Sequence, residues 1–188
     1  MALIEKGMQR PPIDDDFFKD LNFSKSSLKI ASAKELIEKL NIKSFPVDLL
    51  KILQDLNIEY REEILPRDIS GKLEKITNEK DEYIIFVNKF HPQARKNFTI
   101  AHELGHFCLH KNLKEHFEDQ TFFRSDKVDP MESEANIFAA ELLMPENEFS
   151  QKISNGVNTI SGLSEEFDVS TLAVRVRAKQ LGLAGHGL

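Results

Sequence analysis

The sequence predicts an α+β domain in which a small antiparallel sheet packs against a long helix, followed by a C-terminal helical segment. Three observations carry this prediction. The chain has 188 residues, which is enough for one domain with a small appendage. Apolar residues follow helical spacing in 31–57 and 90–145, whereas 58–89 holds short β-prone runs. A further pair of helical patterns follows in 146–188.

Composition narrows the class of protein. Hydrophobic residues make up 40% of the chain and charged residues 30%, which is typical of a globular protein. The formal charge of -6 argues against a general nucleic-acid coating role. The one cysteine, Cys108, excludes an internal disulfide framework and a four-cysteine zinc site. Because we find neither a secretory signal nor a membrane-spanning run, we expect a reducing, cytoplasmic location and no membrane partner.

The amino-terminal third divides into an extension and two helices. Residues 1–30 contain helix-breaking prolines and an acidic run without an apolar face, so we expect a loosely attached arm. Residues 31–57 then predict two core-packing helices. Ser32 can cap the first helix, and Pro46 stands where the second could begin.

Residues 58–89 predict three strands, at 58–64, 72–76 and 83–87, with turn signals at 69–71 and 78–81. Tight connections of this kind suggest an antiparallel meander.

The third of these strands fits two positions equally. As an edge strand bordering a cleft, it would offer Tyr83, Ile85 and Val87 to a substrate that adds as an extra strand. Otherwise it is a central strand with both edges covered.

The strongest chemical signal is the H-E-x-x-H motif formed by His102, Glu103 and His106 within the helical stretch 93–109. Residues four apart on an α-helix lie within about 40° of each other, so the two histidines can present their imidazoles to one metal ion. Glu103 lies about 100° round the helix, where it can act on a water molecule beside the metal. A glycine at 105 makes sense if the metal or another backbone comes close. Zinc suits two imidazoles and a carboxylate with an open fourth position.

A third ligand must come from elsewhere. His110 lies about 12 Å beyond the first histidine along the helix axis, so we expect it to support the site or the fold. A second helix, ending near Pro145, carries Glu132 about 50° from the centre of its apolar stripe and Glu134 more than about 100° away. Glu132 is therefore the better ligand and Glu134 the lesser alternative. Asn136, one turn after Glu132, could orient a ligating histidine.

Together these residues resemble the ImmA/IrrE family of metallopeptidases. The resemblance covers about residues 31–183 and rests chiefly on two motifs, FTIAHELGH at 98–106 and ESEANIFAAELLMP at 132–145. Weaker matches lie at 46–50, 69–71 and 85–88.

The resemblance implies a zincin-like domain, similar to gluzincins, in which His102, His106 and Glu132 bind Zn²⁺ and Glu103 is catalytic. It also implies a protein substrate, since studied members of the family cleave helix-turn-helix transcriptional repressors that are usually encoded nearby.

The expected organisation is an N-terminal extension, a metallopeptidase domain and a C-terminal helical segment, at 1–30, 31–145 and 146–188. Two helices around Val169 have the apolar spacing of a helix-turn-helix core, and Arg175, Arg177 and Lys179 make the last one basic. We favour packing on the catalytic domain, or recognition of a protein substrate, over DNA binding. No recognition helix is demonstrable from the pattern alone.

Two functions follow. The first is a zinc endopeptidase acting on a regulatory protein. The second is a non-catalytic regulator with a structural metal, or none, that binds DNA through 159–182. The first is favoured, since a binding module has no evident need for Glu103. For an oxyanion-stabilising donor the sequence offers Tyr83, His110 and His116 without distinguishing among them.

Overall fold

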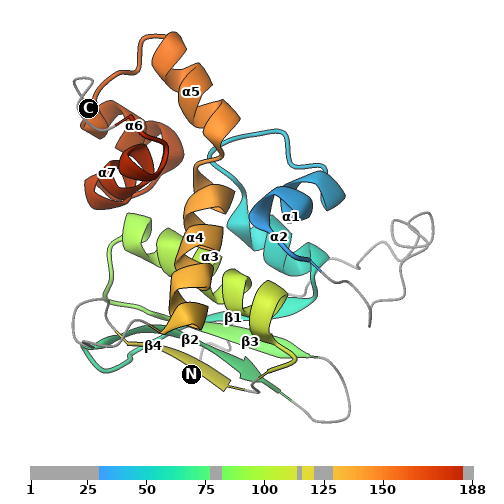
Figure 1. The fold of residues 1–188 in the computed structure, drawn as a ribbon. Helices are drawn as coiled ribbons and strands as arrows, with labels where there is room; N and C mark the ends of the chain where they lie inside the picture. The colour runs from blue at the N-terminus through green and yellow to red at the C-terminus, as the bar shows by residue number, and fades with distance from the viewer. Residues whose placement is uncertain (1–29, 77–81, 114–115, 121–128, 184–188) are drawn as a thin grey trace, which may run out of the picture.

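The structure is a computed structural model that describes residues 30–76, 82–113, 116–120 and 129–183 (Figure 1). Of the extension expected at 1–30, only Ile30 lies among the described residues. The mixture of elements confirms the predicted α+β class. None of the helices in the described ranges is long and apolar enough to cross a membrane. In chain order the elements are α1 (Ala33–Lys39), α2 (Leu49–Asp55), β1 (Ile58–Glu63), β2 (Ile69–Lys75), β3 (Tyr83–Asn88), α3 (Gln93–His110), β4 (His116–Gln120), α4 (Pro130–Leu143), α5 (Glu146–Ser154), α6 (Ile160–Phe167) and α7 (Thr171–Gln180).

The described strands form one sheet in the order β1-β3-β2-β4. β3 pairs in parallel with β1 and antiparallel with β2, and β2 also pairs antiparallel with β4. The expected meander is therefore wrong, because β1 and β2 follow each other in sequence but are not neighbours in the sheet. Residues 69–71, expected as a turn, belong to β2, where Gly71 pairs with Val87.

The connection from β1 to β2 passes over the end of β3 and is held there by Asn88. This buried side chain donates its amide hydrogens to the carbonyl oxygens of Leu65, Pro66 and Ile69, at 3.2, 3.2 and 3.0 Å. One asparagine thereby pairs with three backbone carbonyl groups of this connection and of the start of β2. The sequence signal for this arrangement is only an asparagine at a strand end.

β3 lies inside the sheet, between β1 and β2, and all six of its residues are buried. The edge-strand alternative for Tyr83, Ile85 and Val87 is therefore wrong, and the central-strand alternative is right. A continuous apolar run, here Tyr83 to Val87, is typical of a strand covered on both faces and flanked on both edges.

The first two helices begin where a side chain caps them. Ser32 accepts a hydrogen bond from the backbone N–H of Glu35, as the sequence predicts. α2 begins at Leu49 rather than at Pro46, because the Asp48 side chain accepts from the backbone N–H of Lys51.

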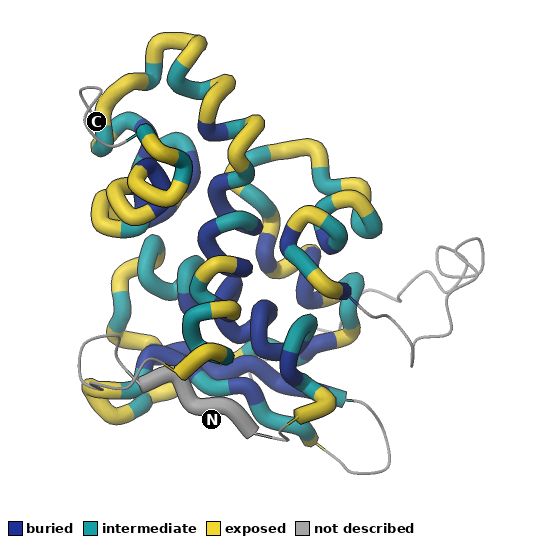
Figure 2. The backbone as a smooth tube through the Cα atoms, viewed as in Figure 1, coloured by how far each residue is buried: buried dark blue, intermediate teal, exposed yellow. Residues whose placement is uncertain are grey.

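The helices lie on one side of the sheet, with α3 across it and α4 on α3 (Figure 1). Figure 2 shows that buried residues gather along these two helices and the strands beneath them. α3 and α4 approach most closely at Gly105, where an added Cβ would lie 3.0 Å from the Cα and 3.1 Å from the carbonyl oxygen of Ala135. The expectation that another backbone comes close to residue 105 is confirmed.

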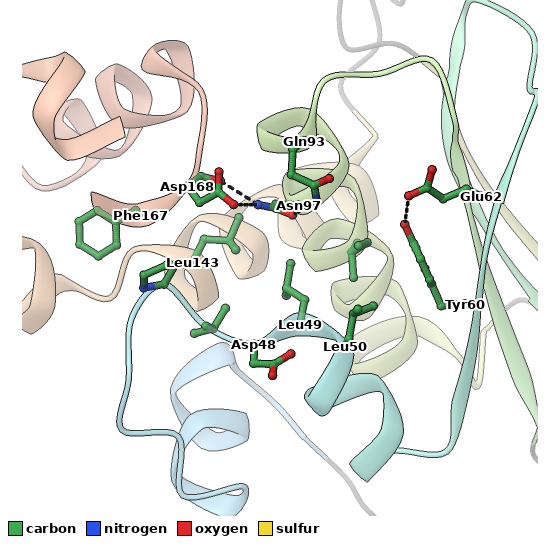
Figure 3. A pocket seen from close by; sticks show the side chains of 13 residues that line it. Asp48, Leu49, Leu50, Tyr60, Glu62, Gln93, Asn97, Leu143, Phe167 and Asp168 are labelled. Carbon is green, nitrogen blue, oxygen red and sulfur yellow. Dashed lines mark hydrogen bonds between the residues drawn. The ribbon is translucent and has the colours of Figure 1, made fainter. Parts of the chain in front are cut away.

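The C-terminal helices pack on this central pair. Phe149 of α5 and Phe167 of α6 are fully buried and stack with ring centroids 5.8 Å apart. Asn97 of α3 donates to the backbone carbonyl and the carboxylate of Asp168 at 2.9 and 2.8 Å, directly after α6 (Figure 3). The two predicted helices around Val169 are confirmed as α6 and α7.

Arg177 does not share the outer face of α7 with Arg175. Its side chain is buried, and its Nε–H donates to the carbonyl oxygen of Met144 at 2.9 Å, beyond the end of α4. Arg175 is exposed. The predicted basic face of this helix therefore loses one of its two arginines to a structural contact.

We expect Gly105→Ala to destabilise the protein by up to about 2 kcal/mol. Alanine gains about 1 kcal/mol of helix propensity, but overpacking costs about 1–3 kcal/mol when the neighbour is rigid backbone. Chemical denaturation of the zinc-free protein measures the difference. Gly162→Ala in α6 is the matched control, since its methyl group would meet only side-chain atoms of Thr159 and Val157. Equal or greater stability of Gly105→Ala would contradict the close contact.

We expect Arg177→Ala to lower the free energy of unfolding by about 1.5–3 kcal/mol, as is usual when a hydrogen bond to a charged group is lost. Arg175→Ala should change it by less than about 0.5 kcal/mol, because that side chain is exposed. Thermal or urea denaturation of both variants is the measurement, and similar values for the two would argue against the contact with Met144.

Candidate metal centre

The inner face of α3 carries three histidines at intervals of four residues. His102, His106 and His110 are all buried, with 0%, 1% and 2% of their surface exposed. Helical periodicity places them in one row, and the close approach of α4 covers that row. A buried row of three imidazoles needs polar partners, and α4 supplies them.

The atoms of the predicted ligands converge. The Nε2 atoms of His102 and His106 lie 3.0 Å apart. The Glu132 carboxylate, from the first turn of α4, approaches the same two atoms at 3.2 and 3.4 Å. These three residues also form the one group of potential metal ligands found among the described residues.

This donor set fits zinc. Three ligand atoms at about 2.0–2.1 Å from a tetrahedral zinc ion stand about 3.3–3.4 Å from one another, close to the 3.0, 3.2 and 3.4 Å found here. Two neutral imidazoles and one carboxylate are also the chemistry that a zinc site with an open position uses. The Glu132 side chain keeps 38% of its surface exposed, whereas both histidines are enclosed. The open side of the centre is therefore the side of Glu132.

Each histidine of the pair makes a hydrogen bond through its other ring nitrogen. The Nδ1–H of His102 donates to the Asn136 side-chain oxygen at 2.9 Å. Nδ1 of His106 lies 3.1 Å from Nδ1 of His110, whose Nε2 in turn lies 2.9 Å from a carboxylate oxygen of Glu134. The structure thus brings Asn136 and His110 to the positions that the sequence analysis gave them. Glu134 contacts His110 instead of the ligand atoms, a role that the sequence analysis missed.

Electrostatics also suit a cation. Burial lowers the pKa of His106, so the ring is neutral at pH 7, the form that ligates a metal. Burial alone would raise the pKa of Glu132, but its close contacts with His102 and His106 outweigh burial and hold that pKa well below its usual range. The centre therefore combines neutral nitrogen donors with an ionised carboxylate.

Glu103 is fully buried on the side of α3 that faces β2. A Cβ at Gly71 of β2 would lie 3.4 Å from a Glu103 carboxylate oxygen, 2.4 Å from the Thr99 side chain and 2.8 Å from the Phe86 carbonyl oxygen. A side chain at this position would clash with Thr99 and with the backbone of Phe86, so glycine is required here. The sequence analysis assigned 69–71 to a turn and so missed the part of Gly71 in the site.

The other candidate residues do not join this cluster. Tyr83 packs its ring edge-on against Phe107 in the core, at a centroid distance of 5.1 Å. His116 lies on β4, and its side chain is outside the described part of the chain. Burial raises the pKa of the Cys108 thiol to about 12, which agrees with a small apolar packing role.

A cavity of about 300 Å³ lies elsewhere, around the amino-terminal end of α3 (Figure 3). Leu49, Leu50 and Ile100 contribute apolar surface to its lining, and Asn97 and Asp168 contribute polar groups. None of the histidines or glutamates of the metal centre lines it. The candidate site is therefore identified by the converging ligand atoms and not by this cavity.

Comparisons with known proteins agree with the motifs. A profile of the IrrE N-terminal-like domain family matches residues 55–179. Metallopeptidase ImmA from Bacillus subtilis strain 168 is 32% identical over 111 residues, which cover 54% of this chain and 59% of that protein. Uncharacterized immunity region protein 2 from Bacillus phage phi105 is 40% identical over 75 residues, covering 39% of this chain and 45% of that protein. The chain thus matches about half of the length of each relative.

A solved structure shares the fold. The Mycobacterium tuberculosis transcriptional regulator superimposes with a TM-score of 0.56 over 87% of this chain and 49% of that one, at 19% sequence identity. At this identity the likeness supports the fold alone.

We expect the purified protein to hold about one zinc ion per chain, measured by elemental mass spectrometry on material without a histidine tag. His102→Ala should lose the ion, because it removes one of three ligand atoms. His91→Ala is the matched control, since His91 is not part of the cluster, and it should retain the metal. Protein that binds no zinc, even after zinc is offered and the excess removed, would refute the site.

Proposed function

Because the chain belongs to the ImmA/IrrE family of metallopeptidases, we propose that it is a zinc-dependent endopeptidase that hydrolyses a peptide bond in a regulatory protein. The observation that carries this proposal is the convergence of His102, His106 and Glu132. Glu103, next to a ligand in the sequence, has no comparable use in a structural metal site. We infer a helix-turn-helix transcriptional repressor as the substrate class and the cytoplasm as the location.

The proposed mechanism divides the work between the metal and one glutamate. A bound zinc ion would supply Lewis-acid chemistry, acidifying water and polarising a carbonyl group. His102, His106 and Glu132 would hold it, and Asn136 and His110 would orient the two imidazoles. The Glu103 carboxylate takes the proton of the attacking water. As the carbon–nitrogen bond of the peptide breaks, Glu103 gives this proton to the leaving amine.

We infer that substrate approaches from the side of Glu132, the most exposed of the three ligands. β4 is the sheet edge nearer α3, because it pairs with β2 alone among the described strands and contacts α3. An extended peptide can add to such an edge through backbone hydrogen bonds. β4 thereby takes the role that the sequence analysis considered for Tyr83, Ile85 and Val87.

The names of two similar proteins support a repressor substrate. One relative is named a metallopeptidase and another an immunity region protein of a phage. The matches span about half of each relative, so the substrate assignment is part of the proposal.

The DNA-binding alternative has less support. It relied on a basic face of α7, but Arg177 is buried against Met144. The neighbouring helix α6 carries Glu165 and Glu166, which would repel phosphates.

We expect Glu103→Gln to reduce cleavage of the repressor by about 10²–10⁴-fold, the usual worth of a general acid–base group. Zinc content should stay at the wild-type level, since Glu103 is not among the converging ligands. The assay co-incubates the purified protein with helix-turn-helix repressors encoded beside its gene and follows the fragments by mass spectrometry.

Arg175→Ala is the control for this assay, because a peptidase needs no basic face on α7. If Glu103→Gln cleaves as well as the wild type, the proposed role of Glu103 is wrong. If Glu103→Gln is silent in a repression assay in cells while Arg175→Ala abolishes function, the DNA-binding alternative replaces the proposal.

A further inference from the structure

The two histidines of the metal centre differ in the hydrogen-bond partner of Nδ1, the ring nitrogen that points away from the metal site. His102 donates from Nδ1 to an amide oxygen, that of Asn136, at 2.9 Å. An amide oxygen can only accept, so it fixes the proton on Nδ1 and leaves the lone pair on Nε2 for the metal. His106 instead meets another imidazole, His110, across 3.1 Å between the two Nδ1 atoms. An imidazole nitrogen can donate or accept, so His110 alone does not determine where the proton of His106 resides.

Glu134 removes this ambiguity. A carboxylate oxygen of Glu134 lies 2.9 Å from Nε2 of His110, and an ionised carboxylate can only accept. A His110 ring with a single N–H therefore points it from Nε2 at Glu134, and its Nδ1 accepts. His106 must then donate from Nδ1, which leaves the lone pair of its Nε2 facing Nε2 of His102, 3.0 Å away.

From these contacts we infer that Glu134 is a positioning residue for the zinc centre, acting through His110 to fix the tautomer and the ring orientation of His106. The inference rests on the proposed zinc site. It adds Glu134 behind His110, which in turn stands behind the ligand His106.

The burial of the three residues agrees with this order. The side chains of His106 and His110 expose only 1% and 3% of their surface, whereas that of Glu134 exposes 60%. The buried pair of histidines is therefore connected to the surface through the contact of His110 with the exposed Glu134 carboxylate. Glu134 stands two residues after the ligand Glu132 on α4, so one helix supplies both a ligand and the residue that orients another ligand.

The structure also separates this role from a general effect of charge. If Glu134 acted only by adding negative charge near the metal, the effect would persist without His110. If it acts through the hydrogen bond, the effect requires His110 and survives in any side chain that offers an acceptor oxygen at the same place.

The test is a double-mutant cycle on zinc affinity, measured by competition with a chromophoric chelator. We expect Glu134→Ala and His110→Ala each to weaken zinc binding by about 10–100-fold, the usual cost of losing such support behind a ligand. The double variant should bind zinc no more weakly than His110→Ala alone. Glu134→Gln should stay within about 3-fold of the wild type, because its amide oxygen still accepts from His110.

Glu141→Ala is the matched control, a glutamate on the same helix that is not in contact with the histidine row, and it should leave zinc affinity unchanged. The visible spectrum of the cobalt-substituted protein gives a second readout, since its bands report ligand geometry. We expect the bands to shift in Glu134→Ala and to return in Glu134→Gln.

Wild-type zinc affinity in Glu134→Ala would overturn the inference. So would an equal loss on removing Glu134 in the presence and in the absence of His110. Because Glu134 is largely exposed, its variants should fold, and their affinity and spectra decide the matter even if His110→Ala does not fold. A wild-type protein that binds no zinc would instead overturn the proposed function together with this inference.

Discussion

The contact between α3 and α4 at Gly105 is the constraint on which the metal centre depends. The two helices approach so closely there that a methyl group at residue 105 would press on the backbone of Ala135 and require it to shift. One turn of α4 before that contact, Glu132 reaches the Nε2 atoms of two histidines of α3. A small increase in the distance between the helices would open the ligand triangle. Glycine weakens a helix by about 1 kcal/mol, but at position 105 it allows the close helix contact on which the metal site depends.

Burial and hydrogen bonding then set the chemistry of the cluster. Three imidazoles enclosed between two helices are unfavourable unless each polar atom has a partner. Asn136 and Glu134 satisfy the outer nitrogens, and the inner nitrogens face the Glu132 carboxylate. α4 thus supplies three polar residues at alternate positions, 132, 134 and 136. The histidine row that α4 covers explains why these polar residues occur on a helix that is otherwise largely apolar.

The sequence predicts the parts of this site that follow from helical periodicity. The spacing of His102 and His106 and the wheel position of Glu132 need only one helix each, and the structure brings these residues together. The sheet order depends on pairings between distant segments, and no local pattern encodes them. The meander was therefore wrong, β4 was missed, and the central place of β3 was only one of two alternatives. The contact of Glu134 with His110 also escaped prediction, because its wheel position describes burial and not the reach of the side chain.

The place of β3 in the sheet has a consequence for biosynthesis. β1 and β2 leave the ribosome first, yet they are not partners, since β3 separates them in the sheet. A nascent chain that has exposed both strands but not residues 83–88 holds no pairing between them. Once β3 emerges, it can pair with both β1 and β2, and Asn88 at its end can hold the connection between them. Three strands of the sheet beneath α3 can therefore pair before that helix emerges, and β4, which follows α3 in the sequence, is added afterwards.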